Sequence, residues 1–99
     1  MNKSGKGCPR PGDIWWVSML DNIKGRPILV LACENDIVAF RKCTSQLSDF
    51  RERVVIEDYY EAGLDKATYV DPELRRITRS KLVRKMGHLS EFDSLKFGL

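Results

Sequence analysis

Short apolar runs, separated by polar turn segments, recur along the first half of this 99-residue chain. The runs at residues 14–20, 27–33 and 37–43 are rich in β-branched and aromatic residues, which favours strands. The second run is continuously apolar and therefore indicates a strand covered on both faces. Proline has no N–H for a sheet ladder, so Pro27 is expected to begin that strand. Residues 34–36 are polar and predict a tight turn that joins the last two runs into a hairpin.

Shorter apolar stretches continue the strand pattern in the second half of the chain. Residues 45–52 predict a loop, and strands are predicted at residues 53–57 and 67–71. A short sixth strand is expected at residues 75–78. Five or six short strands at regular spacing predict a small, strongly curved antiparallel barrel, so the expected fold class is mainly β.

Two helical segments are predicted near the C-terminus. Ser80 can cap a helical turn through Lys85, which Gly87 would end. Ser90 and Asp93 have the spacing of a capping box, in which a hydroxyl and a carboxylate satisfy the first N–H groups of a helix. This spacing predicts a terminal helix over residues 91–97.

Composition is that of one globular domain. Hydrophobic residues make up 42% of the chain and charged residues 31%, with a net charge of +3. Residues 1–10 are small, basic and polar and predict a disordered tail, followed by a single domain at 11–99. The N-terminal segment lacks the apolar stretch of a signal peptide, and no apolar run approaches the ~20 residues of a membrane span. We therefore expect a cytoplasmic protein that makes no membrane contact.

The cysteine and histidine content argues against a metal site. The three cysteines include no CxxC pair, and His88 is the single histidine of the sequence. Cys33 and Cys43 lie in apolar runs, which indicates buried free thiols in a reducing compartment. We expect neither a metal nor another cofactor.

The predicted hairpin brings an arginine close to a pair of hydroxyls. With a three-residue turn, partners across the hairpin have numbers that sum to 70, which places Arg26 opposite Thr44. A two-residue turn would shift the partner to Cys43 or Ser45. Within one register step, a guanidinium and a hydroxyl therefore meet at the open end of the hairpin.

An arginine beside hydroxyl groups is well suited to hold a phosphate, because the guanidinium donates a fork of hydrogen bonds. Gly25 would let a ligand approach the backbone closely, and Lys24, Arg41 and Lys42 add positive charge nearby. The alternative is an ordinary one, in which Arg26 is a solvated strand-end residue and the two hydroxyls begin a turn.

The order of several motifs resembles one known family. The stretch from Pro11 to Phe97 is similar to the PemK/MazF (Kid) family of toxins from toxin–antitoxin pairs. The motifs that carry this similarity, in chain order, are PGDIWWVSM, GRPILVL, CTSQ, GLDKATYV and RKMGHLSEFD. The segment at residues 21–25 is shorter than the corresponding loop of the family and lacks the glutamate and histidine often found there.

The resemblance implies both a fold and an activity. It implies an SH3-like or CcdB-like barrel that forms a homodimer and binds a cognate antitoxin. It also implies a metal-independent endoribonuclease that cuts single-stranded RNA. Two alternatives remain open, namely a non-catalytic toxin of the CcdB type that poisons a protein target, and a non-toxic SH3-like binding module.

The resemblance also implies particular site residues. Arg26 matches the arginine of the family's RP motif, and Thr44 matches the threonine of its T-[ST] motif, so these two are the candidate catalytic residues. Asp71 matches an acidic position of the family loosely. Together with Lys24, Ser45 and Gln46, it is assigned to substrate binding.

RNA can be cut without a water nucleophile when the 2′-OH attacks the adjacent phosphorus. This reaction needs a proton acceptor and stabilisation of the charge on the phosphorane. Arg26 suits stabilisation, whereas Asp71 or Asp21 could accept the proton. His88 is an alternative acid or base, although a capping or surface role is favoured for it.

The tryptophan pair predicts two environments. Adjacent residues of a strand face opposite sides, so one of Trp15 and Trp16 is expected in the core and the other at a dimer interface or groove. Stacking of these rings on nucleobases is the less favoured alternative. The exposed member of this pair, together with Phe92, Leu95 and Phe97, could cover the partner in a homodimer.

Overall fold

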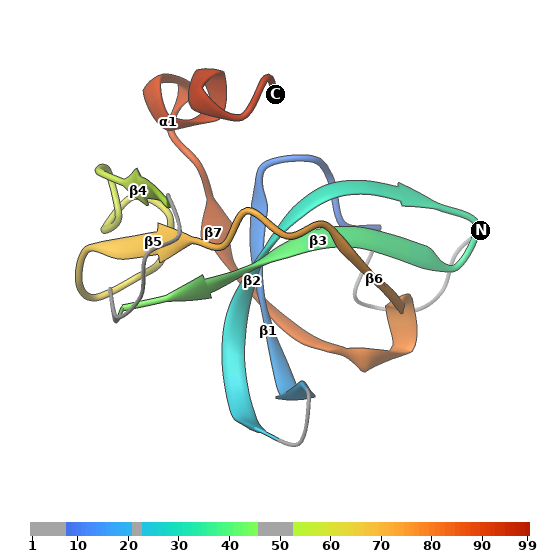
Figure 1. The fold of residues 1–99 in the computed structure, drawn as a ribbon. Coiled ribbons are helices and arrows are strands. Elements are labelled where there is room, and N and C mark those ends of the chain that lie inside the picture. The colour runs from blue at the N-terminus through green and yellow to red at the C-terminus, as the bar shows by residue number, and fades with distance from the viewer. Residues whose placement is uncertain (1–7, 21–22, 46–52) are drawn as a thin grey trace.

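The computed structural model describes residues 8–20, 23–45 and 53–99, with backbone alone at 19, 20, 23 and 24. Seven strands in this part of the chain precede one short terminal helix (Figure 1). The elements are β1 (Asp13–Leu20), β2 (Ile23–Glu34), β3 (Ile37–Thr44), β4 (Val54–Ile56), β5 (Thr68–Val70), β6 (Arg75–Thr78), η1 (Arg79–Lys81), β7 (Leu82–His88) and α1 (Glu91–Lys96). None of the helices described here is long and apolar enough to cross a membrane.

The strands form one antiparallel, barrel-like sheet in the order β4-β5-β3-β2-β1-β7, with β6 paired to β3. This confirms the predicted fold class, a small mainly β barrel with a C-terminal helix. Two buried apolar clusters stabilise it. One contains Phe40 and Val17 and lies between β1, β2, β3 and β7, and the other contains Ile14, Leu29 and Val70 and lies nearer to α1.

The β2–β3 hairpin reaches the predicted register by a different route. Its turn has two residues rather than three, and Asn35 takes a left-handed φ of 58° there, which asparagine tolerates well. A bulge after Val30 then shifts the register by one residue. Ile28 therefore pairs with Lys42, and the two numbers have the predicted sum of 70.

The sheet divides where β2 reaches Pro27. The last pair between β2 and β3 is Ile28 with Lys42, and beyond it β3 pairs with β5 through Cys43 and Thr44. Pro27 has no N–H with which to continue the ladder, so β2 leaves β3 at this residue and stays with β1. Figure 1 shows the two strands diverging. The prediction that Pro27 begins the strand was wrong, because β2 begins at Ile23.

The predicted helical turn at residues 80–85 is also wrong. The 3-10 turn η1 ends at Lys81, and the following residues form β7, which pairs with the outer edge of β1. Leu82 is buried in the core as the first residue of this strand. Gly87 does not end a helix but lies against the Ala62 carbonyl, where a Cβ would come within 2.4 Å of the oxygen. The glycine thus allows the backbone of β7 to lie close to the backbone at Ala62.

The terminal helix is confirmed, and its cap also anchors it to the sheet. The Ser90 hydroxyl accepts a hydrogen bond from the Asp93 N–H, as the capping-box spacing predicts. The Asp93 carboxylate instead accepts from the N–H groups of Glu57 and Asp58, at 3.1 and 2.8 Å. It also lies 3.0 Å from the Lys96 ammonium. Asp93 is fully buried, so these contacts fix α1 beside β4.

Acid is expected to destabilise the fold partly through Asp93. Burial alone would raise the pKa of Asp93, but hydrogen bonds from Asp58, Lys96 and Glu57 and the charge of Lys96 lower it below 3.8. As the pH falls below about 3.8, the unfolded chain binds the proton first, so the stability that Asp93 contributes above that pH is lost. Urea unfolding at a series of pH values measures this loss. Asp93→Asn is expected to weaken the dependence of the unfolding free energy on pH. The same dependence in the variant and the wild type would contradict the contribution assigned to Asp93.

Candidate functional site

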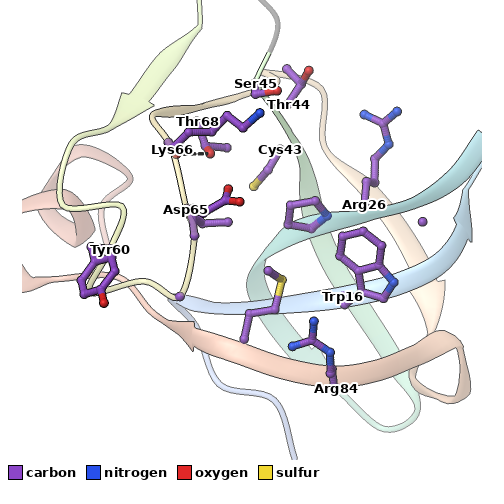
Figure 2. Close-up of a pocket in the computed structure, with 15 residues that line it drawn as sticks. Trp16, Arg26, Cys43, Thr44, Ser45, Tyr60, Asp65, Lys66, Thr68 and Arg84 are labelled. Atoms are coloured by element: carbon purple, nitrogen blue, oxygen red, sulfur yellow. Dashed lines mark hydrogen bonds between the residues drawn. The ribbon is translucent and has the colours of Figure 1, made fainter.

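A pocket opens where β2 and β3 separate. It has a volume of about 930 Å³ and receives side chains from β1, β2, β3, β5 and β7 and from residues 60–66 (Figure 2). The residues that line it are Trp16, Gly25, Arg26, Pro27, Cys43, Thr44, Ser45, Tyr60, Gly63, Leu64, Asp65, Lys66, Thr68, Arg84 and Met86. Three cations and one carboxylate are among them, so the pocket is electropositive.

Arg26, Thr44 and Ser45 all line this pocket. The predicted pairing of Arg26 with Thr44 was wrong, because β2 leaves β3 after Ile28 and Thr44 pairs with Tyr69 on β5. Figure 2 shows the three side chains along one part of its rim, with Arg26 on β2 and the hydroxyls at the end of β3. The Nε of Arg26 is buried and has no hydrogen-bond partner among the described residues. An unpaired buried donor costs about 1–3 kcal/mol.

The other predicted substrate-binding residues do not join this group. Lys24 lies in β2 opposite Met19, toward the tip of the β1–β2 hairpin, and its side chain is outside the described residues. Gln46 also lies outside them. Asp71 is buried and does not line the pocket.

Asp71 has structural contacts instead. Its carboxylate accepts a hydrogen bond from the Glu73 N–H at 2.9 Å and lies 3.9 Å from Arg53 Nη2. Its carbonyl accepts from Arg41 Nε at 2.8 Å, and the same guanidinium lies over the Phe97 ring. These contacts hold Arg41 and Asp71 together at the junction of β5 and β3. The geometry therefore gives no support for RNA binding by Asp71.

His88 lies at the end of β7, outside the pocket lining. Its Nδ1 is 2.7 Å from Oδ1 of Asp13, a buried carboxylate that also accepts from the Arg10 N–H and from Trp15 Nε1. Burial alone would raise the pKa of Asp13, but the bonds from Arg10, His88 and Trp15 and the charge of Lys85 lower it. The pair ties β1 to β7, a contact that differs from the capping or surface role favoured for His88.

Sequence reasoning missed three charged residues of the pocket. Arg84 lies in a basic stretch typical of a solvated face, but its strand pairs it with Trp16 on β1 and so brings it to the pocket. Asp65 and Lys66 follow the buried Leu64, which fixes their segment against the core. No local signal marks these positions, because their proximity depends on how β7 and residues 60–66 pack.

The two tryptophans occupy different environments, as the strand alternation predicts. Trp15 is 3% exposed and belongs to the core cluster around Phe40. Trp16 faces the pocket, so the groove rather than the core receives its indole. Tyr60, in an acidic segment that argues against an RNA contact, lines the opposite side of the pocket and is 86% exposed (Figure 2).

The pocket thiol is not suited to be a nucleophile. Cys43 is buried, and desolvation raises its pKa to about 12 despite the nearby charges of Arg41 and Arg26. It is therefore a neutral thiol at physiological pH. Cys33 is partly buried and Cys8 exposed, and all three cysteines are free.

The side chains predicted to cover a partner are only partly accessible. Phe92 and Leu95 on α1 are exposed by 55% and 71%. Phe97 is partly buried against the core and beneath Arg41. The homodimer therefore remains a prediction.

The described residues contain no group of three or more His, Cys, Asp or Glu side chains arranged to hold a metal ion. No model of a known protein family matches the chain, and a search of curated proteins also gives no match.

Proposed function

We propose that this protein is an endoribonuclease that binds single-stranded RNA in the pocket and cleaves it by attack of a 2′-OH. The observation that carries the proposal is the presence of Arg26, Thr44 and Ser45 along one part of an electropositive pocket. The resemblance of the sequence motifs to PemK/MazF toxins supports the same activity, as does the small antiparallel barrel.

A phosphate is the ligand that best matches this group of donors. Arg26 lines the pocket, and the terminal amino groups of its guanidinium can donate two hydrogen bonds to phosphate oxygens. The hydroxyls of Thr44 and Ser45 can donate further bonds. Lys66 and Arg84 extend the positive potential along the pocket, which suits a polyanion rather than a single small anion.

The pocket also supplies groups for the proposed reaction. The 2′-oxygen forms a bond to phosphorus, and its proton passes to the Asp65 carboxylate, the one acidic group among the described pocket residues. Arg26 stabilises the charge that develops on the phosphorane oxygens. The bond from phosphorus to the 5′-oxygen then breaks, and this oxygen takes a proton from water. The products are a 2′,3′-cyclic phosphate and a 5′-hydroxyl.

The wider role follows from the motifs rather than from the pocket. We propose a toxin of a toxin–antitoxin pair that acts in the cytoplasm as a homodimer and is inhibited by a cognate antitoxin. This role is tested separately, by whether expression of the protein stops growth and whether an Arg26→Ala variant relieves the arrest.

The activity is tested with purified protein and an end-labelled single-stranded RNA in excess EDTA. We expect discrete cleavage products that carry 2′,3′-cyclic phosphate and 5′-hydroxyl ends. A substrate with a single 2′-deoxy residue at the mapped site is expected to resist cleavage there, because the nucleophile is absent. Intact RNA, or products with 5′-phosphate ends, would reject the proposed reaction and favour a non-catalytic binding protein.

A further inference from the structure

The wall of the pocket carries an indole between two arginines. Trp16 lies on β1, where its partners across the sheet are Pro27 on β2 and Arg84 on β7. Arg26 is the residue next to Pro27 and pairs with Val17, so its side chain leaves β2 on the face opposite to that of Trp16. Both arginines nevertheless line the same pocket as the indole. Neighbouring strands are about 4.8 Å apart, which separates the two backbone positions by roughly 10 Å. Figure 2 shows the indole between Arg84 and Arg26, with the Arg26 guanidinium directed away from the ring.

Gly25 fixes the position of this indole. Its backbone lies against the ring of Trp16, and a Cβ at this position would come within 2.6 Å of the ring atom Cζ2 and 2.7 Å of Nε1. Only glycine leaves room for the ring there. The ring is therefore held against Gly25, and both residues line the pocket. A fixed aromatic ring loses little conformational entropy when a ligand stacks on it.

An aromatic surface between cations matches one class of ligand. Nucleobases stack on aromatic rings, and phosphates on either side of the base require positive charge. A base within a duplex already stacks on its neighbours, so the ring is accessible only to an unpaired base.

We propose that Trp16 is a stacking platform for one base of a single-stranded nucleic acid, whose flanking phosphates bind Arg26 and Arg84. The inference rests on the proposed function and deepens it, because it identifies an unpaired base as a part of the substrate that the pocket binds. Every base has a π face, so stacking at Trp16 selects for single strands rather than for one base.

The test separates the base from the phosphates. The first probe is a fluorescently labelled oligothymidylate, which has no 2′-OH and cannot be cleaved by the proposed reaction. The second is an oligomer of the same length with abasic tetrahydrofuran residues, which keeps the phosphates and lacks the bases. Binding of both probes is measured by fluorescence anisotropy for the wild-type protein and for Trp16→Ala, Trp16→Phe and Arg84→Ala.

Trp16→Ala is expected to weaken binding of oligothymidylate by about 5- to 100-fold, the range for loss of one stacked base. Its affinity for the abasic oligomer is expected to stay within about twofold. Trp16→Phe keeps an aromatic ring and is expected to retain most of the affinity. Arg84→Ala is expected to weaken both probes and to lower the salt dependence by about one counterion.

Equal weakening of both probes by Trp16→Ala would overturn the inference, because it would show that the indole only maintains the shape of the pocket. Unchanged binding of both probes, or absence of wild-type binding, would overturn it as well. Urea unfolding of each variant identifies a loss of fold, in which case Trp16→Phe decides the outcome. Base-dependent binding without RNA cleavage would reject the proposed function while leaving this inference intact, and cleavage without base-dependent binding would do the reverse.

Discussion

Replacement of Arg26 by alanine is expected to reduce RNA cleavage by at least about 10²- to 10³-fold, the cost of losing one donor that stabilises a developing negative charge. The fold is expected to tolerate the change, because the buried Nε of Arg26 has no partner among the described residues. Removing an unsatisfied donor avoids its desolvation cost. The free energy of unfolding is therefore expected to remain the same or to rise slightly. Single-turnover cleavage and urea unfolding measure the two effects.

Two further variants control this result. Arg76 is exposed on β6 and does not line the pocket, so Arg76→Ala removes the same charge elsewhere and is expected to retain activity. Arg26→Lys keeps the charge but not the planar fork, and partial activity is expected. Full activity of Arg26→Ala would show that the pocket arginine is not part of the reaction. Equal losses in Arg26→Ala and Arg76→Ala would show a general effect of charge.

Replacement of Gly63 by alanine is expected to cause the largest loss of stability among single methyl additions, about 3 kcal/mol. Gly63 has a φ of +84°, and a Cβ there would lie 2.1 Å from the Met86 carbonyl oxygen. Because this neighbour is backbone, either β7 or residues 60–66 must move. That segment carries Tyr60, Asp65 and Lys66, so cleavage is expected to fall as well. Urea unfolding and the RNA cleavage assay measure both losses.

Gly98 provides a matched control for the backbone conformation. It has a similar φ of +71°, but nothing lies within 4 Å of a Cβ built there. Gly98→Ala is therefore expected to cost only the left-handed strain, about 1 kcal/mol, and to leave cleavage unchanged. Similar losses in the two variants would show that strain, rather than contact with β7, makes Gly63 necessary.

Local patterns in the sequence were sufficient for much of the fold. Apolar runs with β-branched and aromatic residues marked the first three strands, because side-chain alternation and burial act within a few residues. The pair of Ser90 and Asp93 marked the terminal helix, because a cap is also a local interaction. The exposed stretch before Gly87 gave a misleading signal, because Ser80 and Gly87 occupy positions typical of a helix cap and a helix end. It is a strand because β1 has an open edge to which it can pair.

The candidate site, like the fold, was predictable from local patterns only in part. Antiparallel pairing converts numbering into neighbours once the turn is located, and it gave the pair of Ile28 and Lys42 correctly. It does not account for Arg26 and Thr44, which line one pocket although the two strands have separated before them. The register was correct only because a bulge after Val30 compensates for a shorter turn. Such a bulge depends on the curvature of the sheet, and it cannot be inferred from the numbering of residues across a turn.

The β class, the terminal helix and the register of the β2–β3 hairpin up to Ile28 and Lys42 could therefore be predicted from local sequence patterns. The tertiary structure alone decided that the sheet divides at Pro27 and that the resulting pocket receives Arg84 from β7 and Asp65 from the segment before β5. The physical reason is the range of the interactions. Strand pairing across a turn acts between neighbours in the chain, whereas the packing of Gly63 against β7 joins segments more than twenty residues apart.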